Sequence, residues 1–473
     1  MRVAIVGAGF GGLCMAVHLA RKGIPHVVFE KGDGVGGTWR DNTYPGAGCD
    51  IPSHLYSFSF EPWCDWSRRY PGQPEILAYL EMVAARHRVR PRFGTEVTEL
   101  AHDGSGWLVV TPGGVERFDV VVTAVGQLNR PRVPEIPGAE TFRGEAFHSA
   151  RWGSRDLAGK RVAVVGTGSS AAQLVPSLAG TARQVDVYQR TPSWVLPKAD
   201  GAFSPLTRAV FRRVPGAHRL YREWQFAYLE NTVFPALVEG WSTGLIRRAG
   251  LAHLRSQVAD PGLRRRLTPG YPPGCKRIVL DSRFYPALTR HDVELITDPI
   301  TRIVPEGVET PAGVRQAEVI VYATGFHTTE FLLPMTVTGT CGRDLREQWR
   351  DGAEAYLGMA APGFPNLFFL YGPNTNLGHN SIVHMLEAQV GYVMRCLHLI
   401  ARRGRMEVTE AAMSAYTTAL NRALAATVWN QGCRSWYKTE AGRITNNWPR
   451  SARDYRRLTR RPRPGAYNFG AGR

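Results

Sequence analysis

The chain begins with a glycine-rich motif whose spacing is typical of dinucleotide binding. Residues 7–12, GAGFGG, follow the G-x-G-x-x-G pattern. In this pattern the first glycine permits a tight turn, the second lets a pyrophosphate approach the backbone, and the third lets a helix pack on a strand. Glu30 stands where a carboxylate can accept hydrogen bonds from ribose hydroxyls. We therefore predict that Gly7, Gly9, Gly12 and Glu30 bind a dinucleotide; the alternative is a glycine-rich turn in an ordinary parallel sheet.

A second motif of the same kind lies further along the chain and differs where the ribose would bind. Residues 166–171, GTGSSA, have the G-x-G-x-x-A spacing. The position that corresponds to Glu30 holds Gln189, and Arg190 and Thr191 follow it. A carboxylate would repel a phosphate on the ribose 2′ oxygen, whereas a guanidinium can bind it through two hydrogen bonds. The first site thus suits FAD, and the second suits NADPH rather than NADH; the alternative for Arg190 is an ordinary surface arginine.

Alternating strands and helices must position these motifs. Residues 3–6 and 27–29 are apolar runs of strand type on either side of an amphipathic stretch that reaches Lys22. Residues 161–165 and 185–188 flank a second such stretch, which reaches about Leu178. The pattern predicts an α/β fold with two Rossmann-like dinucleotide-binding domains, one for FAD and one for NADP. Two dinucleotide sites in one chain imply two cofactors that exchange a hydride, so we predict a flavoprotein oxidoreductase.

Two later apolar runs each lead into a glycine. Residues 120–125 precede Gly126, and residues 319–324 precede Gly325. We expect both runs to be strands that pass the chain between the two domains, with glycine allowing a close approach there. The alternative is two ordinary buried strands.

Composition and charge narrow the class of protein. The chain has 473 residues, of which 44% are hydrophobic and 21% charged, as in folded proteins. No apolar run approaches the ~18 residues that would span a bilayer. The net charge of +18 would favour binding to nucleic acid, to an anionic membrane face or to anionic cofactors. Since no nucleic-acid-binding motif accompanies the charge, we expect no nucleic-acid partner and no integral membrane segment.

The seven cysteines are scattered and never form a C-x-x-C pair. This argues against a disulfide framework, a zinc site and a dithiol redox pair, so we expect no bound metal. Cysteines used in this way fit a reducing compartment, and we expect the protein to be cytoplasmic.

The segment before the second glycine motif resembles a family fingerprint. Residues 142–152, FRGEAFHSARW, fit the pattern F-x-G-x-x-x-H-x-x-x-W of type I Baeyer–Villiger monooxygenases, which are class B flavin-dependent monooxygenases. The family pattern continues after Trp with Pro or Asp, whereas Gly153 follows here. Other segments that resemble the family, between residue 1 and about residue 450, are GGTWRDNTYPGAGCDIPSHLYSFSFEP, GTGSSAAQ, YQRTP, PPGCKR, YATGF and SWY.

The resemblance implies an FAD domain that is interrupted by an NADP domain. We expect the FAD-binding domain at 1–148 and 326–473 and the NADP-binding domain at 149–325, with a helical insertion at about 201–265. The resemblance also implies that NADPH reduces the flavin, that O₂ then forms a C4a-peroxyflavin, and that a ketone substrate becomes an ester or lactone. A permanent positive charge must keep that peroxide deprotonated.

The resemblance also implies roles for single residues. Arg277, in PPGCKR, stands where the family has its catalytic arginine, and Asp50 matches the aspartate that orients it. Lys276 matches a lysine that helps to bind the NADPH 2′-phosphate, and Trp436 matches a tryptophan that contacts bound NADP. The other expected FAD contacts are Gly37, Thr38, Trp39, Asp50, Tyr56, Val97 and Gln127. The other expected NADPH contacts are Gly166, Thr167, Gly168, Ser169, Ser170, Arg190 and Thr191.

Two further functions stay open on the sequence alone. One is oxygenation of an amine or sulfide by the same flavin, and the other is binding of FAD and NADPH without turnover, as in a sensor or scaffold. Arg277 favours a ketone, since a nucleophilic peroxide attacks carbonyls. His148 lies at the domain junction, where we expect a hinge or hydrogen-bonding role rather than acid–base catalysis. We expect the substrate pocket near 377–385 and the insertion; the residues predict neither the particular ketone nor the oligomeric state.

Overall fold

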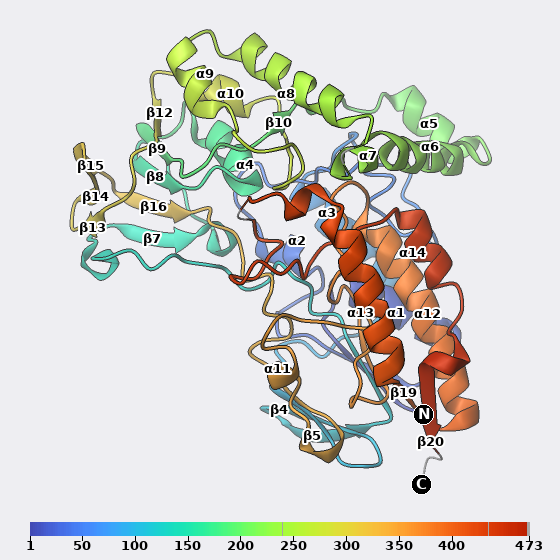
Figure 1. Ribbon diagram of the computed structural model, residues 1–473. Helices are drawn as coiled ribbons and strands as arrows, with labels where there is room; N and C mark the ends of the chain where they lie inside the picture. Colours follow the sequence, from blue (N-terminus) through green and yellow to red (C-terminus); the bar gives the residue numbers. More distant parts are fainter. Residues whose placement is uncertain (239, 434, 471–473) are drawn as a thin grey trace.

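A computed structural model describes residues 1–238, 240–433 and 435–470 and is built around two parallel sheets (Figure 1). The first sheet has the strand order β18-β6-β1-β2, and the second has the order β12-β9-β8-β16-β7. The strands of the first are β1 (Val3–Val6), β2 (His26–Phe29), β6 (Val120–Thr123) and β18 (Leu367–Phe369). Those of the second are β7 (Glu145–His148), β8 (Arg161–Val165), β9 (Gln184–Tyr188), β12 (Val293–Ile296) and β16 (Val319–Tyr322). The predicted α/β fold with two Rossmann-like units is confirmed.

The first sheet is buried because its strands are apolar throughout and helices cover it. Every residue of β1 and of β6 is buried, as expected for parallel strands with both faces covered. Helix α1 (Phe10–Arg21) follows β1 directly and packs against the long helix α12 (Ile382–Arg403). Figure 1 shows α12 beside α13 (Glu410–Ala425) and α14 (Ala452–Leu458), so the end of the chain completes the layer around α1.

The second sheet repeats this arrangement with other residues. Strand β8 leads through the second glycine motif into α4 (Ser169–Leu178), and the chain then returns as β9. The strands run parallel in the register Val164↔Val187. Helix α4 buries Ala171, Leu174 and Val175 and packs against α10 (Phe284–Leu288). The strand at 161–165 and the helix end at Leu178 agree with the prediction.

The chain passes between the two sheets at two neighbouring points. Strand β7 precedes residue 149 yet pairs with β16 in the second sheet, in the register His148↔Tyr322. Beyond β6 and β16, Gly126 and Gly325 adopt φ values of 72° and 82°. A Cβ atom at either glycine would meet nothing within 4 Å. Our explanation of these glycines by close approach is therefore wrong: the turn needs their left-handed backbone.

Helices occupy the segment where the insertion was expected. They are α5 (Pro205–Arg213), α6 (Ala217–Thr232), α7 (Phe234–Leu237), α8 (Thr243–Gln257) and α9 (Pro261–Leu267). Figure 1 shows them along the upper edge of the molecule, where α5 and α6 lie together at one end. Short strands β10 (Val195–Leu196) and β11 (Val279–Leu280) pair in parallel and bring the chain into and out of this helical segment.

Smaller elements complete the two halves. Strands β17 (Thr336–Thr338), β3 (Glu99–His102), β4 (Trp107–Thr111) and β5 (Gly114–Phe118) form one sheet in that order. Strands β13 (Arg302–Val304), β14 (Gly307–Thr310) and β15 (Gly313–Gln316) form another, and β19 (Arg405–Val408) pairs with β20 (Tyr467–Gly470). The remaining helices are α2 (Thr38–Asp41), α3 (Gln73–Arg86) and α11 (Leu345–Gln348).

One pair of cysteines differs from the sequence-based expectation. Cys275 and Cys433 form a disulfide, with their Cα atoms 6.2 Å apart. The other five cysteines are free. The two partners are 158 residues apart in the chain, so no local pattern could reveal them. The bond ties the loop that carries Lys276 and Arg277 to the segment that leads to Trp436.

Over the described ranges, no helix is both long enough and apolar enough to cross a membrane. The same ranges contain no cluster of three or more His, Cys, Asp or Glu side chains that could hold a metal ion.

Candidate active site and nucleotide sites

The first glycine turn is held by contacts that only glycine allows. Gly7 has a φ of 105°, and a Cβ there would lie 2.6 Å from the carbonyl oxygen of Ala124. A Cβ on Gly12 would clash with the carbonyl oxygen of Gly7. A Cβ on Gly37 would lie 3.3 Å from the Cα of Gly9, so the two loops expected to contact FAD lie against one another. The packing leaves backbone, not side chains, facing the phosphate position.

Glu30 lies beside this turn, as predicted. Its carboxylate is buried and accepts hydrogen bonds from the Ala8 amide at 2.7 Å and the Gly32 amide at 2.8 Å. A carboxylate has about four acceptor positions, so it can still accept from ribose hydroxyls. The turn and the acid together fit the adenosine end of a dinucleotide.

The second turn repeats the geometry of the first. Gly166 has a φ of 115°, and a Cβ there would lie 2.6 Å from the carbonyl oxygen of Ala323. The Cβ position of Gly168 has no atom within 4 Å, which leaves room for a ligand at the start of α4. The Thr167 hydroxyl donates to the Thr191 carbonyl at 3.2 Å, joining the turn to the segment after β9. Ser169 and Ser170 form the first turn of α4, whose amides lack acceptors within the helix.

Two cations lie near one another in this second site, after the end of β9, where we expect the ribose to bind. Gln189 is buried and donates to the Arg266 carbonyl at 2.8 Å, whereas Arg190 and Thr191 are exposed. Desolvation and then the charge of Arg190 lower the pKa of Lys276, so the two cations act on each other. In the described part of the chain neither cation has a carboxylate within ion-pairing distance. An uncompensated pair of this kind fits a dianionic phosphate.

Arg277 and Asp50 form a bidentate ion pair. The Arg277 Nε donates to Asp50 Oδ2 at 3.0 Å, and its Nη2 donates to Oδ1 at 2.7 Å and to Oδ2 at 2.6 Å. The Asp50 charge raises the pKa of Arg277 above its already high ordinary value, so the guanidinium stays charged. Burial, followed by the effect of Asp50, raises the pKa of neighbouring Cys49 to about 12 and keeps that thiol neutral. The pair therefore combines a permanently charged guanidinium with its Asp50 counter-ion, beside a neutral thiol.

Four aromatic or polar residues expected beside the flavin gather near the first turn. The Trp39 indole donates to the Tyr56 hydroxyl at 3.1 Å, and the Tyr56 ring lies 5.0 Å from that of Phe10. The Thr38 hydroxyl donates to the Leu128 carbonyl at 3.5 Å, which joins this loop to the segment after β6. Gln127 lies in that segment, is buried, and donates to the Tyr371 carbonyl at 3.0 Å.

The remaining expected contacts are placed as follows. Val97 is buried in an apolar cluster with Val6 and Phe29, beneath the end of the first sheet. Trp436 is half-buried, and its carbonyl accepts from the Thr328 hydroxyl at 2.6 Å. Its ring lies 4.3 Å from that of Tyr437, whose pKa is raised to about 12, first by burial.

The fingerprint residues build the junction between the sheets. The His148 Nε2 lies 2.9 Å from the Gly325 carbonyl oxygen, and its Nδ1 accepts from the Ala150 amide at 3.1 Å. Burial lowers the pKa of His148, which favours the neutral ring. A Cβ on Gly144 would clash with the Glu318 carbonyl oxygen, and Trp152 is buried against Phe147. His148 thus has the hydrogen-bonding role that we expected.

Two polar side chains that sequence analysis missed tie these parts together. Gln173, on the buried side of α4, bonds to the loop that carries Asp50. The Asn446 amide donates to the Gln127 side chain at 3.1 Å and to the Thr328 carbonyl at 2.9 Å. The only signal was a glutamine within the apolar face of the helix at 169–178, which could not reveal its partner.

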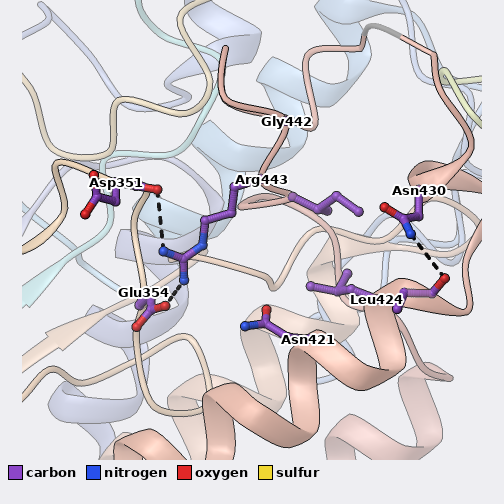
Figure 2. Close-up of a pocket in the computed structure, with 9 residues that line it drawn as sticks. Asp351, Glu354, Asn421, Leu424, Asn430, Gly442 and Arg443 are labelled. Atoms are coloured by element: carbon purple, nitrogen blue, oxygen red, sulfur yellow. Dashed lines mark hydrogen bonds and ion pairs between the residues drawn. The ribbon is translucent and has the colours of Figure 1, made fainter.

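A hollow of about 510 Å³ lies elsewhere, between the 351–354 loop, the end of α13 and the 442–444 loop (Figure 2). Arg443 extends into it, forms an ion pair with Glu354 and donates to the Asp351 carbonyl at 3.5 Å. None of the expected cofactor or catalytic residues lines this hollow, so we do not assign it to the active site.

Comparison with known proteins identifies the family. Residues 4–220 match the pyridine nucleotide-disulphide oxidoreductase family. The chain is 42% identical to a Baeyer–Villiger monooxygenase of Streptomyces coelicolor, over 98% of this chain and 91% of that one. The chain belongs to the flavin-dependent Baeyer–Villiger monooxygenases. The resemblance stated from the fingerprint is therefore confirmed, Gly153 notwithstanding.

Solved structures of Baeyer–Villiger monooxygenases and related enzymes agree with this assignment. OTEMO in complex with FAD and NADP superposes with a TM-score of 0.89 at 27% identity, covering 99% of each chain. Oxidized steroid monooxygenase bound to NADP gives a TM-score of 0.89 at 31% identity, again over 99% of each chain. The family fold with its two nucleotide sites therefore extends over this whole chain.

Proposed function

We propose that this monooxygenase converts a ketone into an ester or lactone with FAD, NADPH and O₂, and that Arg277 is its catalytic residue. The single observation that carries the assignment of Arg277 is its bidentate pair with Asp50. Asp50 lies on a loop tied to α4 of the second site, and Arg277 directly follows Lys276. The fixed cation is thus linked to the second nucleotide site in two ways, through the Asp50 loop and through the chain itself.

Bound FAD, once reduced by NADPH, supplies the oxygen-activating chemistry. Arg277 holds a permanent positive charge where negative charge develops, because its raised pKa excludes deprotonation at any working pH. Asp50 orients the guanidinium through three hydrogen bonds, so little reorganisation is needed when the charge forms. Asp50 also leaves the pair with no net charge, which confines the field of Arg277 to its immediate surroundings.

The first glycine turn binds FAD, and the second binds NADPH. Gly7, Gly9, Gly12 and Glu30 bind the adenosine diphosphate part of FAD, with further contacts from Gly37, Thr38, Trp39, Asp50, Tyr56, Val97 and Gln127. Gly166, Thr167, Gly168, Ser169, Ser170 and Thr191 bind the NADPH pyrophosphate, and Trp436 contacts the same cofactor. Arg190 and Lys276 bind the 2′-phosphate, which the absence of a described carboxylate partner supports.

The same assignment divides the chain into domains. Residues 1–148 and 326–473 form the FAD-binding domain, and 149–325 form the NADP-binding domain with the insertion at about 201–265. At the boundary, β7 belongs to the FAD-binding domain by its position in the sequence, because it precedes residue 149, but it pairs with β16 of the NADP-binding domain. We also place the protein in the cytoplasm, without a nucleic-acid partner; the five free cysteines support a reducing compartment, whereas the Cys275–Cys433 bond is of a kind that is rare there.

To test this function, a cyclic ketone and a thioether are added in separate reactions to the purified yellow holoenzyme with NADPH. We expect NADPH oxidation with the ketone and a product heavier by one oxygen atom. Oxidation of the thioether alone would overturn the ketone assignment in favour of heteroatom oxygenation. Absence of NADPH consumption and of anaerobic flavin bleaching would overturn catalysis altogether.

A further inference from the structure

Helix α6 turns its large apolar residues toward solvent. Leu220, Trp224 and Tyr228 recur every four residues, so they form one row along the helix, and they are 73%, 53% and 49% exposed. The rings of Trp224 and Tyr228 stack with their centroids 5.9 Å apart. A surface helix normally buries such a row, and an exposed one marks an interaction site.

The opposite face of α6 is buried, where Phe226 packs in an apolar cluster and polar contacts hold the helix in place. The Arg222 guanidinium donates to the carbonyls of His54 at 2.6 Å and Ser57 at 2.7 Å. Glu230 accepts from the Asn380 amide at 2.9 Å and lies 2.8 Å from the His379 ring, with both partners of that pair almost wholly buried. Breaking these buried hydrogen bonds to rotate the helix would leave charged groups unpaired. The apolar row therefore stays outside.

Helix α5 and Val214, the residue after it, present a second row with the same spacing. Leu206, Val210 and Val214 are 75%, 38% and 49% exposed. Helices α5 and α6 pack together, with the rings of Phe211 and Tyr221 5.1 Å apart, and Figure 1 shows them at one corner of the molecule. Most of the exposed large apolar side chains of the described chain lie between residues 206 and 245. We call the two rows the insertion face: Leu206, Val210, Val214, Leu220, Trp224 and Tyr228.

The charges around the insertion face are almost all positive. Arg213 and Arg219 are exposed within it, and Arg247 and Arg248 are exposed on neighbouring α8. In the described part of 204–256, Glu223 is the exposed acid, and exposed Asp65, on a loop beside α5, forms an ion pair with Arg212 at 2.9 Å. Apolar and aromatic side chains with a rim of arginines are the composition that adsorbs to an anionic lipid interface. A second copy of this chain fits less well, because a two-fold contact would set these arginines against one another.

We propose that the insertion face binds reversibly to anionic membrane surfaces. Leu220, Trp224 and Tyr228 enter the boundary between headgroups and acyl chains, and Arg213 and Arg219 contact anionic headgroups. This is adsorption to one face of the bilayer, which no helix of the described residues is long and apolar enough to cross. The inference is independent of the ketone chemistry, since it rests on residues outside both nucleotide sites.

The test is sedimentation of the FAD-loaded enzyme with phosphatidylcholine vesicles that contain or lack phosphatidylglycerol. We expect binding to the phosphatidylglycerol vesicles that weakens as salt is raised, and little binding to pure phosphatidylcholine. The triple variant Leu220→Ser/Trp224→Ser/Tyr228→Ser should lower the partition coefficient at least about ten-fold. Arg213→Gln and Arg219→Gln should each lower it by roughly five-fold and reduce the salt dependence.

The matched control is Val115→Ser/Val314→Ser, which removes side chains that are 58% and 47% exposed on β5 and β15, away from the insertion. It should bind vesicles like the wild type. Unchanged binding by the triple variant, or equal binding to both vesicle types, would overturn the proposal. So would sedimentation velocity that finds a wild-type dimer and a monomeric triple variant, which would make the face a contact between copies. If the triple variant loses its flavin, the arginine variants decide the outcome.

Discussion

The Gln173 side chain bonds to both backbone groups of Gly48, two residues before Asp50. Its Nε2 donates to the Gly48 carbonyl at 2.9 Å, and its Oε1 accepts from the Gly48 amide at 3.3 Å and from the Tyr44 hydroxyl at 2.9 Å. Gln173 belongs to α4, which begins at the second glycine turn. One amide thus fixes the position of Asp50, and through it Arg277, relative to the expected NADPH site.

Replacing Gln173 by Leu should loosen this connection. The change removes the side-chain partner of two half-buried backbone groups and one of the two partners of the Tyr44 hydroxyl, which also bonds to Ser170, at about 0.5–1.5 kcal/mol for each hydrogen bond lost. We expect ester yield per NADPH consumed to fall about ten-fold while the KM for NADPH changes less than about two-fold. Ser177→Ala, on the same helix, is the control and should keep the wild-type yield. An unchanged yield in Gln173→Leu would show that α4 does not position the pair.

Replacing Arg277 by Ala should separate the two halves of the reaction. We expect anaerobic flavin bleaching by NADPH to proceed nearly as in the wild type, with ester formation reduced more than about 100-fold and hydrogen peroxide released instead. Arg277→Lys should recover part of the yield, since it keeps the charge but loses the bidentate geometry. Arg283→Ala removes an exposed arginine nearby and serves as the control. Full ester yield from Arg277→Ala would refute the catalytic assignment.

Replacing Arg190 by Ala tests the choice between the two nicotinamide cofactors. Loss of a charge-assisted pair with the 2′-phosphate should raise the KM for NADPH about ten- to 100-fold and leave the KM for NADH within about two-fold. Lys276→Ala should act in the same direction, because the two cations share the site. Equal effects on NADPH and NADH would show that neither cation binds the phosphate.

The two glycine turns could be predicted from the sequence because their geometry is local. A positive φ at Gly7 and at Gly166 and the spacing to the next strand follow from neighbouring residues alone. The same local reasoning explained Gly126 and Gly325 wrongly. A glycine at the end of a strand can be required because a side chain would not fit or because φ is positive, and the sequence does not distinguish these two reasons. The structure shows that the angle does.

The pairs that join distant segments could not be predicted in this way. Arg277 and Asp50 are 227 residues apart, and without a family fingerprint Arg277 is one of many arginines. The partner of Gln173 and the Cys275–Cys433 bond could not be predicted for the same reason, because each depends on how two sheets and their loops come together. The outward row on α6 contradicts the usual rule that apolar helix positions face inward.

The Cys275–Cys433 bond gives a stability prediction. Closing a long loop of the unfolded chain typically stabilises a protein by about 2–4 kcal/mol, so the reductant dithiothreitol should lower the Tm of the wild type. Cys433→Ser should have that lower Tm with or without reductant. Thiol titration of the denatured oxidised protein should count the five free cysteines, and all seven after reduction. Seven thiols before reduction would show that the bond does not form.

The family pattern has Pro or Asp after Trp, where this chain has Gly153. We expect the two substitutions, Gly153→Pro and Gly153→Asp, to differ in their effect on stability. Gly153 has a φ of 65°, whereas proline fixes φ near −65°, and Trp152 before it has helical angles that a following proline disfavours. We expect Gly153→Pro to lower the free energy of unfolding by at least about 1–3 kcal/mol, and the Tm with it. Gly153→Asp should cost at most about 1 kcal/mol, because aspartate tolerates this backbone and a Cβ there would touch only the end of the Arg155 side chain, at 3.4 Å. A Gly153→Pro protein as stable as the wild type would mean that the connection between β7 and β8 can adopt another backbone path.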